Sequence, residues 1–325
     1  MKKKTILIML SVVALALQAT AQTIRTVSVA FNGSTATVTM TDDISSYVTL
    51  TSGTSSHVRL VQSDQVNDAV GEIYYVLSGT TTDGEFYLEG SYKCTLTLSG
   101  VSITNPSGPA INIQNGKRVE VSVKNGTTSR LVDGPNEEYN GAFHCKGHTK
   151  FKGKGTLYVT GNSRHAIYSK EYIEVKNCTI NVVSALKDGM HCKQYFLMES
   201  GVVNIASATD DGIQVELKDA VSTGVTTDHE DEDTGNFYMT GGTLTISNVG
   251  NKNIKADGTI SLTGGTKNFD TSNIEENAAS GVVAVETEAQ ATTEVFDLAG
   301  RRLDGLNPAG ISIIREGDRV RKVIR

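Results

Sequence analysis

The phrase AIYSK at residues 166–170 returns as GMHCK at 189–193 and as GIQVE at 212–216. Six copies align in all: AINIQ (110–114), AFHCK (142–146), AIYSK (166–170), GMHCK (189–193), GIQVE (212–216) and NIKAD (253–257). Consecutive copies start 32, 24, 23, 23 and 41 residues apart (142 − 110, 166 − 142, 189 − 166, 212 − 189 and 253 − 212). A fixed period in the low twenties, with Gly or Asn at the corners, is typical of a solenoid.

Two further β-type runs follow the repeated phrase within a period. They are residues 172–176 and 179–183 in the third copy, and 195–199 and 202–205 in the fourth. No segment shows a competing helical period. The sequence therefore predicts an all-β protein, a right-handed parallel β-helix of three-strand coils with a period of about 23 residues.

The repeat also fixes which side chains face inward. Because side chains alternate across a strand, two columns of each copy point into the same channel. The first column is Ile111, Phe143, Ile167, Met190, Ile213 and Ile254, and the second is Ile113, Cys145, Ser169, Cys192, Val215 and Ala256. One coil cannot bury these stripes alone, so neighbouring rungs about 4.8 Å apart must bury them for each other. The two long spacings predict loops near residues 132–139 and 218–236.

The ends of the chain differ from the repeat. Residues 1–21 combine three lysines, an apolar run and an Ala-Thr-Ala ending, which predicts a secretory signal peptide and a secreted protein. The apolar run is too short to span a membrane. The expected organisation is a signal peptide (1–21), an N-terminal β cap (22–75), the β-helix (76–270), a linker (271–291) and a C-terminal β tail (292–325).

Charge and cysteine content narrow the function. The formal charge is −6, and loss of Lys2, Lys3 and Lys4 with the signal peptide would make it −9 (−6 − 3). So acidic a chain is a poor nucleic-acid partner but a reasonable cation binder. Cys145 and Cys192 fall two rungs apart, about 9–10 Å, which is beyond disulfide reach, so both are expected to fill the core. The cysteine spacing is not that of zinc sites, which disfavours zinc.

Three carboxylates form the candidate metal site. The position before each core strand carries Gly141, His165, Asp188, Asp211 and Lys252 in successive copies. Asp188 should therefore stack on Asp211, with Asp210 adjoining. Carboxylates within about 5 Å repel one another unless a cation neutralises them. Oxygen ligands favour Ca²⁺, and Gln214 or backbone carbonyls would complete its shell. The alternative is a solvated Asp-Gly turn.

An outward ladder on the repeated strand is the candidate ligand surface. His144, Tyr168 and His191 should form a flat aromatic strip about 15 Å long, whose ring faces could meet sugar C–H groups. Flanking amines could pair with uronate carboxylates. The predicted ligand-binding residues are His144, His165, Tyr168, His191, Lys193, Lys252 and Lys255. The alternative is ordinary solenoid surface. The acidic run 228–233 is predicted to be a solvated loop, with a second calcium site as the alternative.

Several motifs in order carry a family resemblance. They lie at residues 84–103, 108–113, 153–157, 165–169, 187–189 and 210–213. Over roughly residues 76–270 the chain resembles the β-helical carbohydrate-binding family typified by a clostridial cellulose- and pectin-binding protein. The resemblance implies a non-catalytic, calcium-carrying β-helix, similar in architecture to the pectate lyases of polysaccharide lyase family 9.

The resemblance to those lyases implies specific roles and one departure. In the lyases a calcium site on adjacent rungs binds uronate, and a lysine one rung on removes the C5 proton. Asp188, Asp210 and Asp211 match the calcium aspartates, and Lys252 falls near the lysine. Where the lyases usually carry a fourth acid, this chain has Gln214. The departure weakens the interpretation as a lyase.

The C-terminal tail carries a second resemblance. About a tenth of the chain, residues 292–325, resembles the short tails of secreted Bacteroidetes proteins, some of which are sorting signals for the type IX export machinery. The alternative is a small β-hairpin that packs beside the solenoid.

Three functional hypotheses follow. The first is a secreted, calcium-binding, non-catalytic protein that recognises an acidic or plant cell-wall polysaccharide. The second is a calcium-dependent polysaccharide lyase with Lys252 as the base. The third is a surface adhesin or structural β-helix. The first is favoured because the resemblance is to a non-catalytic family and because register places no arginine beside Lys252.

Overall fold

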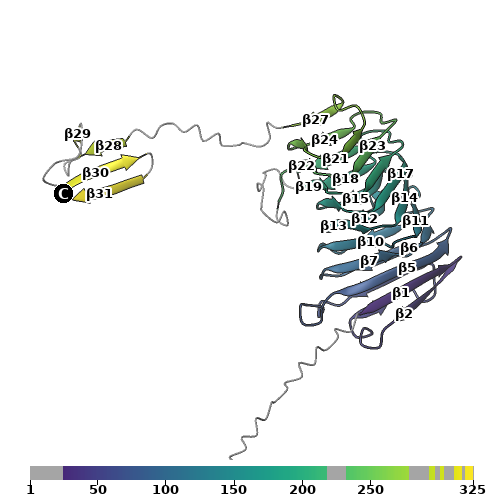
Figure 1. The fold of residues 1–325 in the computed structure, drawn as a ribbon. Helices are drawn as coiled ribbons and strands as arrows, with labels where there is room; N and C mark the ends of the chain where they lie inside the picture. Colours follow the sequence, from purple (N-terminus) through teal and green to yellow (C-terminus); the bar gives the residue numbers. More distant parts are fainter. Residues whose placement is uncertain are drawn as a thin grey trace, which may run out of the picture. The chain divides into compact units, whose positions relative to one another are not determined.

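The computed structural model describes residues 25–217, 232–277, 293–296, 301–303, 311–316 and 319–324. The described residues form strands and no helix (Figure 1). They divide into one unit that ends at Ala278 and a second that spans Ala279–Arg325. No described helix is long and apolar enough to cross a membrane. The predicted signal peptide at residues 1–21 lies outside the described residues.

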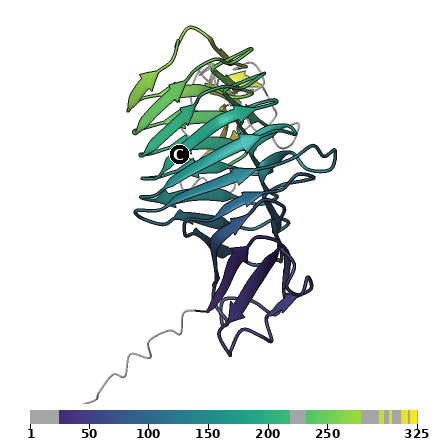
Figure 2. The same ribbon diagram turned by 90° about the vertical axis from the view of Figure 1, so that its right-hand side faces the viewer.

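Between residues 85 and 268, each turn of the first unit contributes three strands. One turn consists of β12 (Gly141–Cys145), β13 (Thr149–Gly153) and β14 (Thr156–Gly161). The next consists of β15 (His165–Ser169), β16 (Ile173–Val175) and β17 (Thr179–Ala185). Each strand pairs in parallel with its counterpart one turn on, and the turns pile up along one axis (Figure 2). The expected all-β, β-helix-like fold is thereby confirmed, while the hand of the coil stays a prediction.

The turns build two long sheets. The ten-stranded sheet runs through β3 (Val48–Leu50), β4 (His57–Gln62), β6 (Glu85–Glu89), β9 (Ile111–Ile113), β12, β15, β18 (Met190–Lys193), β21 (Ile213–Glu216), β24 (Ile254–Ala256) and β27 (Ile274–Glu276). The other strands of the turns form a 17-stranded sheet: β1 (Thr26–Asn32), β2 (Thr35–Met40), β5 (Ile73–Thr81), β7 (Cys94–Leu98), β8 (Ser102–Thr104), β10 (Val119–Val123), β11 (Thr128–Val132), β13, β14, β16, β17, β19 (Tyr195–Met198), β20 (Val202–Ile205), β22 (Asn236–Met239), β23 (Thr243–Ile246), β25 (Ile260–Leu262) and β26 (Thr266–Asn268).

The predicted inward columns are confirmed. Phe143 pairs with Ile111 and Ile167, and the column continues rung by rung to Ile254. The column is fully buried. Cys145 and Cys192 are free and buried in the second column, as expected of core filler. Between the two sheets the core therefore consists of residue stacks that only neighbouring turns can close.

The parallel stack begins earlier than the predicted boundary at residue 76. That boundary falls inside β5, which pairs in parallel with β1. On the other sheet, β4 pairs in parallel with β6. Within the described first unit only β2 and β3 pair antiparallel, with β1 and β4. The segment predicted as a cap therefore contains parallel rungs as well as closing hairpins.

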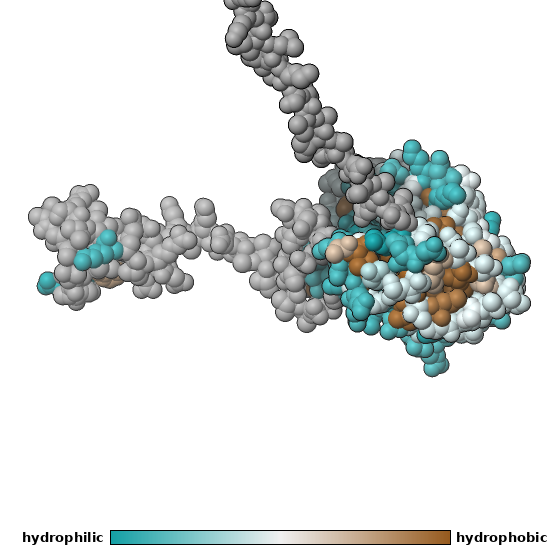
Figure 3. Space-filling view, turned by 90° about the horizontal axis from the view of Figure 1, so that it is seen from below, coloured by the Kyte–Doolittle hydropathy of each residue, from teal (hydrophilic) through white to brown (hydrophobic). Residues whose placement is uncertain are grey.

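The hairpins close the N-terminal end of the solenoid. Val38 and Met40 of β2 and Leu50 of β3 are partly buried and pack against the core. Figure 3 looks onto this end from below and shows hydrophobic residues interspersed with hydrophilic ones. Polar residues among the apolar ones reduce the tendency of a sheet end to pair with another chain.

The C-terminal region is also more structured than expected. The predicted linker at residues 271–291 contains β27, which pairs in parallel with β24 and adds a further rung. Residues 278–292 lie outside the described residues. The predicted β tail holds a separate antiparallel sheet of four strands: β28 (Thr293–Phe296), β29 (Arg302–Leu303), β30 (Ile311–Glu316) and β31 (Arg319–Ile324).

We expect the aromatic stack between the sheets to carry much of the stability. Phe196 and Phe237 are fully buried on successive turns, with parallel rings and centroids 5.0 Å apart. Phe196→Ala should lower the free energy of unfolding by about 3–5 kcal/mol, because it leaves a cavity that the rungs cannot close. Exposed Leu186→Ala should change it by less than about 0.5 kcal/mol. Urea titration followed by circular dichroism measures both, and equal losses would contradict an enclosed core.

Candidate functional site

Two Asp-Gly corners align the acidic residues. A Cβ on Gly189 would lie 2.7 Å from the carbonyl oxygen of Gly212, and one on Gly212 would lie 2.5 Å from that of Asn253. Only glycine permits so close an approach of successive rungs. The amide of Gly189 donates to the Asp211 carbonyl at 3.0 Å. The corners therefore bring Asp188 and Asp211 into the predicted register.

The three predicted carboxylates do converge. Asp188, Asp210 and Asp211 each offer an oxygen, and these oxygens lie within 4.8 Å of one another. Asp188 and Asp211 are buried, whereas Asp210 is half-buried. Asp211 Oδ1 accepts the Lys252 backbone N–H at 2.9 Å. Its other oxygen, Oδ2, is buried and has no hydrogen-bond partner in the described part of the chain.

The electrostatics of the two buried acids differ. Burial raises the pKa of Asp211, and repulsion from Asp210 and Asp188 adds to the rise. Burial also acts to raise the pKa of Asp188, but hydrogen bonds with His165 and His191 outweigh it and leave that pKa lowered. Asp211 is thus the acid that a nearby cation would stabilise most as a carboxylate.

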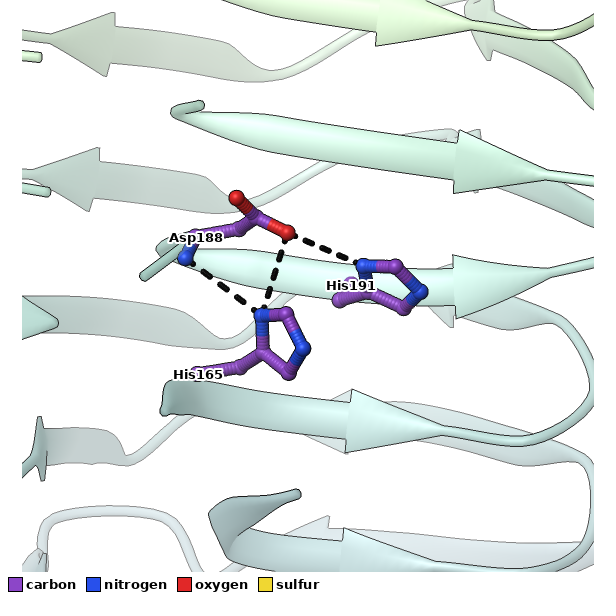
Figure 4. Close-up of side chains that lie close together, drawn as sticks. All are labelled: His165, Asp188 and His191. Atoms are coloured by element: carbon purple, nitrogen blue, oxygen red, sulfur yellow. Dashed lines mark hydrogen bonds and ion pairs between the residues drawn. The ribbon is translucent and has the colours of Figure 1, made fainter. Parts of the chain in front are cut away.

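Asp188 also faces two histidines, which sequence reasoning had assigned to sugar binding. Its Oδ2 lies 3.1 Å from His165 Nδ1 and 2.9 Å from His191 Nδ1 (Figure 4). His165 comes from β15 and His191 from β18, and both are buried. In the sequence, Asp188 and His191 are three residues apart, and His165 occupies the position of Asp188 one rung earlier. The repeat reveals these positions, but it does not reveal the direction of each side chain.

The aromatic ladder is present, but its rings are not open. His144 stacks on Tyr168 with centroids 5.2 Å apart, and Tyr168 on His191 with centroids 5.5 Å apart. The three side chains are only 8%, 7% and 3% exposed. The prediction of ring faces open to a sugar is therefore wrong. At a rung spacing of about 4.8 Å, stacked rings cover one another's faces and leave only edges for a ligand.

The remaining predicted residues lie beside this ladder and pair with acids. Lys193 Nζ lies 3.1 Å from Glu216 Oε2. Gln214 donates its amide to Glu216 Oε1 at 3.3 Å, which places it beside Glu216. Lys252 and Lys255 share a further acid, since each Nζ lies 3.9 Å from a Glu275 oxygen. Each of the three amines therefore lies within an ion pair. Of the acidic run 228–233, residues 228–231 lie outside the described residues, and Glu232 and Asp233 are buried.

Comparison with known proteins bears on this site. A family model described as carbohydrate-binding domain-containing protein matches residues 63–299. A protein of the same description from Acetivibrio thermocellus is 25% identical over 118 residues, which is 33% of this chain and 41% of that protein. The chain thus matches less than half the length of this relative.

A solved structure shares the fold. It is described as the polysaccharide lyase-like protein from C. thermocellum, in a gadolinium derivative. The similarity has a TM-score of 0.56 at 19% identity and covers 77% of this chain and 99% of that one. At this identity the likeness concerns the fold alone. Together the comparisons confirm the resemblance drawn from the sequence at the level of a carbohydrate-binding domain protein.

The buried ladder predicts a pH dependence of stability. Burial lowers the pKa of His144 to about 4, and the nearby Lys146 and His165 act in the same direction. An unfolded histidine has a pKa of about 6.5, so between these values the unfolded chain binds a proton that the folded chain does not. The free energy of unfolding should fall as pH drops through this window, by up to about 3 kcal/mol for this one group.

The variant His144→Gln should reduce that fall, with His57→Gln, whose side chain is 38% exposed, as the control. Denaturant titrations between neutral and mildly acidic pH measure the effect. An unchanged fall in His144→Gln would mean that the ring is not buried as a neutral group.

Proposed function

The chain belongs to the family of carbohydrate-binding domain-containing proteins, and we propose that it is a secreted, calcium-dependent, non-catalytic receptor for an acidic polysaccharide. The family and the fold support carbohydrate binding. The observation that carries the calcium dependence is the unpartnered, buried Oδ2 of Asp211 within the acidic cluster of Asp188, Asp210 and Asp211.

The acidic cluster fits calcium chemically. Its three residues supply only oxygen donors, which Ca²⁺ prefers in sets of six to eight. A buried carboxylate oxygen without a hydrogen bond is costly unless a cation satisfies it. Half-buried Asp210 connects the cluster to the surface. Backbone carbonyls, waters or ligand oxygens would complete the shell.

The surface beside the cluster suits a polyanion. Lys193, Lys252 and Lys255 keep 29%, 30% and 33% of their side chains exposed. Their amines pair with Glu216 and Glu275, and the carboxylates of a uronate can replace these glutamates as ion-pair partners. Bound calcium would bridge the acidic cluster to the same sugar carboxylates. The edges of His144 and Tyr168 supply the adjoining apolar contact.

The position of Lys252 favours a binding protein over a lyase. Its backbone N–H contacts Asp211, while its Nζ lies 3.9 Å from Glu275 Oε2. The amine is thus directed to an ion pair, whereas a base must reach the substrate proton with its nitrogen. Secretion through residues 1–21, and export with the help of the tail at 292–325, form part of the same proposal.

Calcium should stabilise the folded protein. For one site, Ca²⁺ at about 100 times its dissociation constant should add about 2.7 kcal/mol to the free energy of unfolding. Asp211→Asn should abolish this gain, and exposed Asp42→Asn should retain it. Thermal unfolding with calcium and with EDTA measures the shift. A wild-type melting temperature that calcium leaves unmoved would reduce the acids to turn residues.

Polysaccharide binding should depend on the same cluster. In affinity electrophoresis through polygalacturonate, the wild-type protein should be retarded with calcium and released by EDTA. Lys193→Ala should weaken retardation severalfold. Lys124→Ala serves as the charge-matched control, because Lys124 is exposed and directly follows β10 of the 17-stranded sheet. Retardation by no glycan, charged or neutral, would favour the adhesin hypothesis. Release of unsaturated sugar that disappears in Lys252→Ala would instead establish a lyase.

A further inference from the structure

A second cluster of metal-ligating atoms lies on the other side of Asp188. His165 Nδ1, His191 Nδ1 and an oxygen of Asp188 lie within 4.8 Å of one another. All three side chains are at least nine-tenths buried, and the two imidazole centroids are 4.3 Å apart. The cluster joins two rungs, since His165 lies on β15 while Asp188 and His191 lie on the next turn.

The distances within this cluster call for a positive charge at its centre. Asp188 Oδ2 lies 2.9 Å from His191 Nδ1 and 3.1 Å from His165 Nδ1. A carboxylate oxygen and an imidazole lone pair repel each other at this distance, so a proton or a metal ion must lie between Oδ2 and each ring nitrogen. His191 Nε2 lies 3.5 Å from Glu216 Oε2, where a proton on Nε2 would face that carboxylate and free Nδ1 for a metal ion. The backbone N–H of Asp188 lies 3.3 Å from His165 Nδ1, a contact that a bound ion would replace.

We propose that His165 Nδ1, His191 Nδ1 and Asp188 Oδ2 bind a divalent transition-metal ion of the zinc type. Two imidazoles and one carboxylate form a donor set that suits Zn²⁺ and its neighbours, whereas Ca²⁺ prefers oxygen alone. The cysteine spacing, which disfavours a thiolate zinc site, has no bearing on a histidine–carboxylate set. A fourth position would remain for water or a ligand atom.

The surroundings match those of known metal centres. A ligating histidine usually donates its second ring N–H to a carboxylate, which orients the ring. Glu216 stands in that place beside His191, and Lys193 holds Glu216 through an ion pair at 3.1 Å. Exposed Lys187 directly precedes Asp188, so the cluster lies close beneath the surface.

The two proposed sites use different oxygens of Asp188. Oδ2 faces the histidines, while Oδ1 accepts the backbone N–H of Asp211 at 3.2 Å on the side of the acidic cluster. A soft-ligand site and a hard-ligand site would thus adjoin through one carboxylate. The transition-metal site does not rest on the calcium site or on glycan binding, because its nitrogen ligands take part in neither.

The test uses the full chain, stripped with a chelator and titrated with Co²⁺ and Zn²⁺. Co²⁺ should give visible absorption bands that Zn²⁺ displaces, with one ion bound per chain. His165→Gln and His191→Gln should each lose the bands and at least about a hundredfold in affinity. Glu216→Gln should retain the bands with an affinity about 10–100-fold lower.

Two controls make the outcome specific. His144→Gln removes a buried histidine of the same ring ladder, whose Nδ1 accepts from Asn140 instead, and should bind Co²⁺ as the wild type does. Asp210→Asn should lose calcium stabilisation yet keep the Co²⁺ bands, which separates this proposal from the calcium proposal. Circular dichroism confirms that each variant is folded.

Absence of Co²⁺ bands in the folded wild-type protein would overturn the proposal and leave a protonated histidine as the charge between the acceptors. Bands that persist in both His165→Gln and His191→Gln would overturn it as well, since the ion would then lie elsewhere. If one histidine variant fails to fold, the other and Glu216→Gln still decide the question.

Discussion

The spacing between parallel rungs governs the rest of this structure. Every ladder pair places a residue about 4.8 Å from its counterpart on the next turn, so any residue type that repeats with the coil becomes a continuous column. At Gly189 and Gly212 the rungs approach so closely that a Cβ would collide with a backbone oxygen. The close contact at these corners fixes the register of the neighbouring rungs. A one-residue slip would turn the apolar columns outward and would also separate the acids.

The same spacing has opposite effects on different side chains. Apolar columns gain from it, because each rung covers the next. Aromatic rings fit it so well that His144, Tyr168 and His191 cover one another and lose the open faces that sugar recognition would use. For carboxylates the spacing is unfavourable, because it holds the like charges of Asp188 and Asp211 close together and away from water. A stacked acid column therefore calls for counter-charge, from histidine or from a cation.

What the sequence could predict follows from this periodicity. The inward columns and the grouping of Asp188, Asp210 and Asp211 depend on register alone, which the spacing of the repeats reveals. The early rungs were not predicted because the repeated phrase is absent from them, although β1 pairs in parallel with β5 and β4 with β6. β27 was not predicted because its three residues are too few to show the alternation of apolar and polar side chains. The contact between Asp188 and His165 depends on side-chain rotamers, which the spacing of the repeats does not determine.

Asp188 links these consequences. Its position in the register makes it a neighbour of Asp211 above and of His165 below, and burial prevents water from satisfying either oxygen. Its two oxygens therefore have separate environments, one with a backbone amide and acids, the other with imidazole nitrogens. A carboxylate divided in this way can transmit charge from one side to the other, because a cation on either oxygen withdraws electron density from both. Occupancy of the histidine side should then weaken the attraction of Asp188 for a cation on the acidic side.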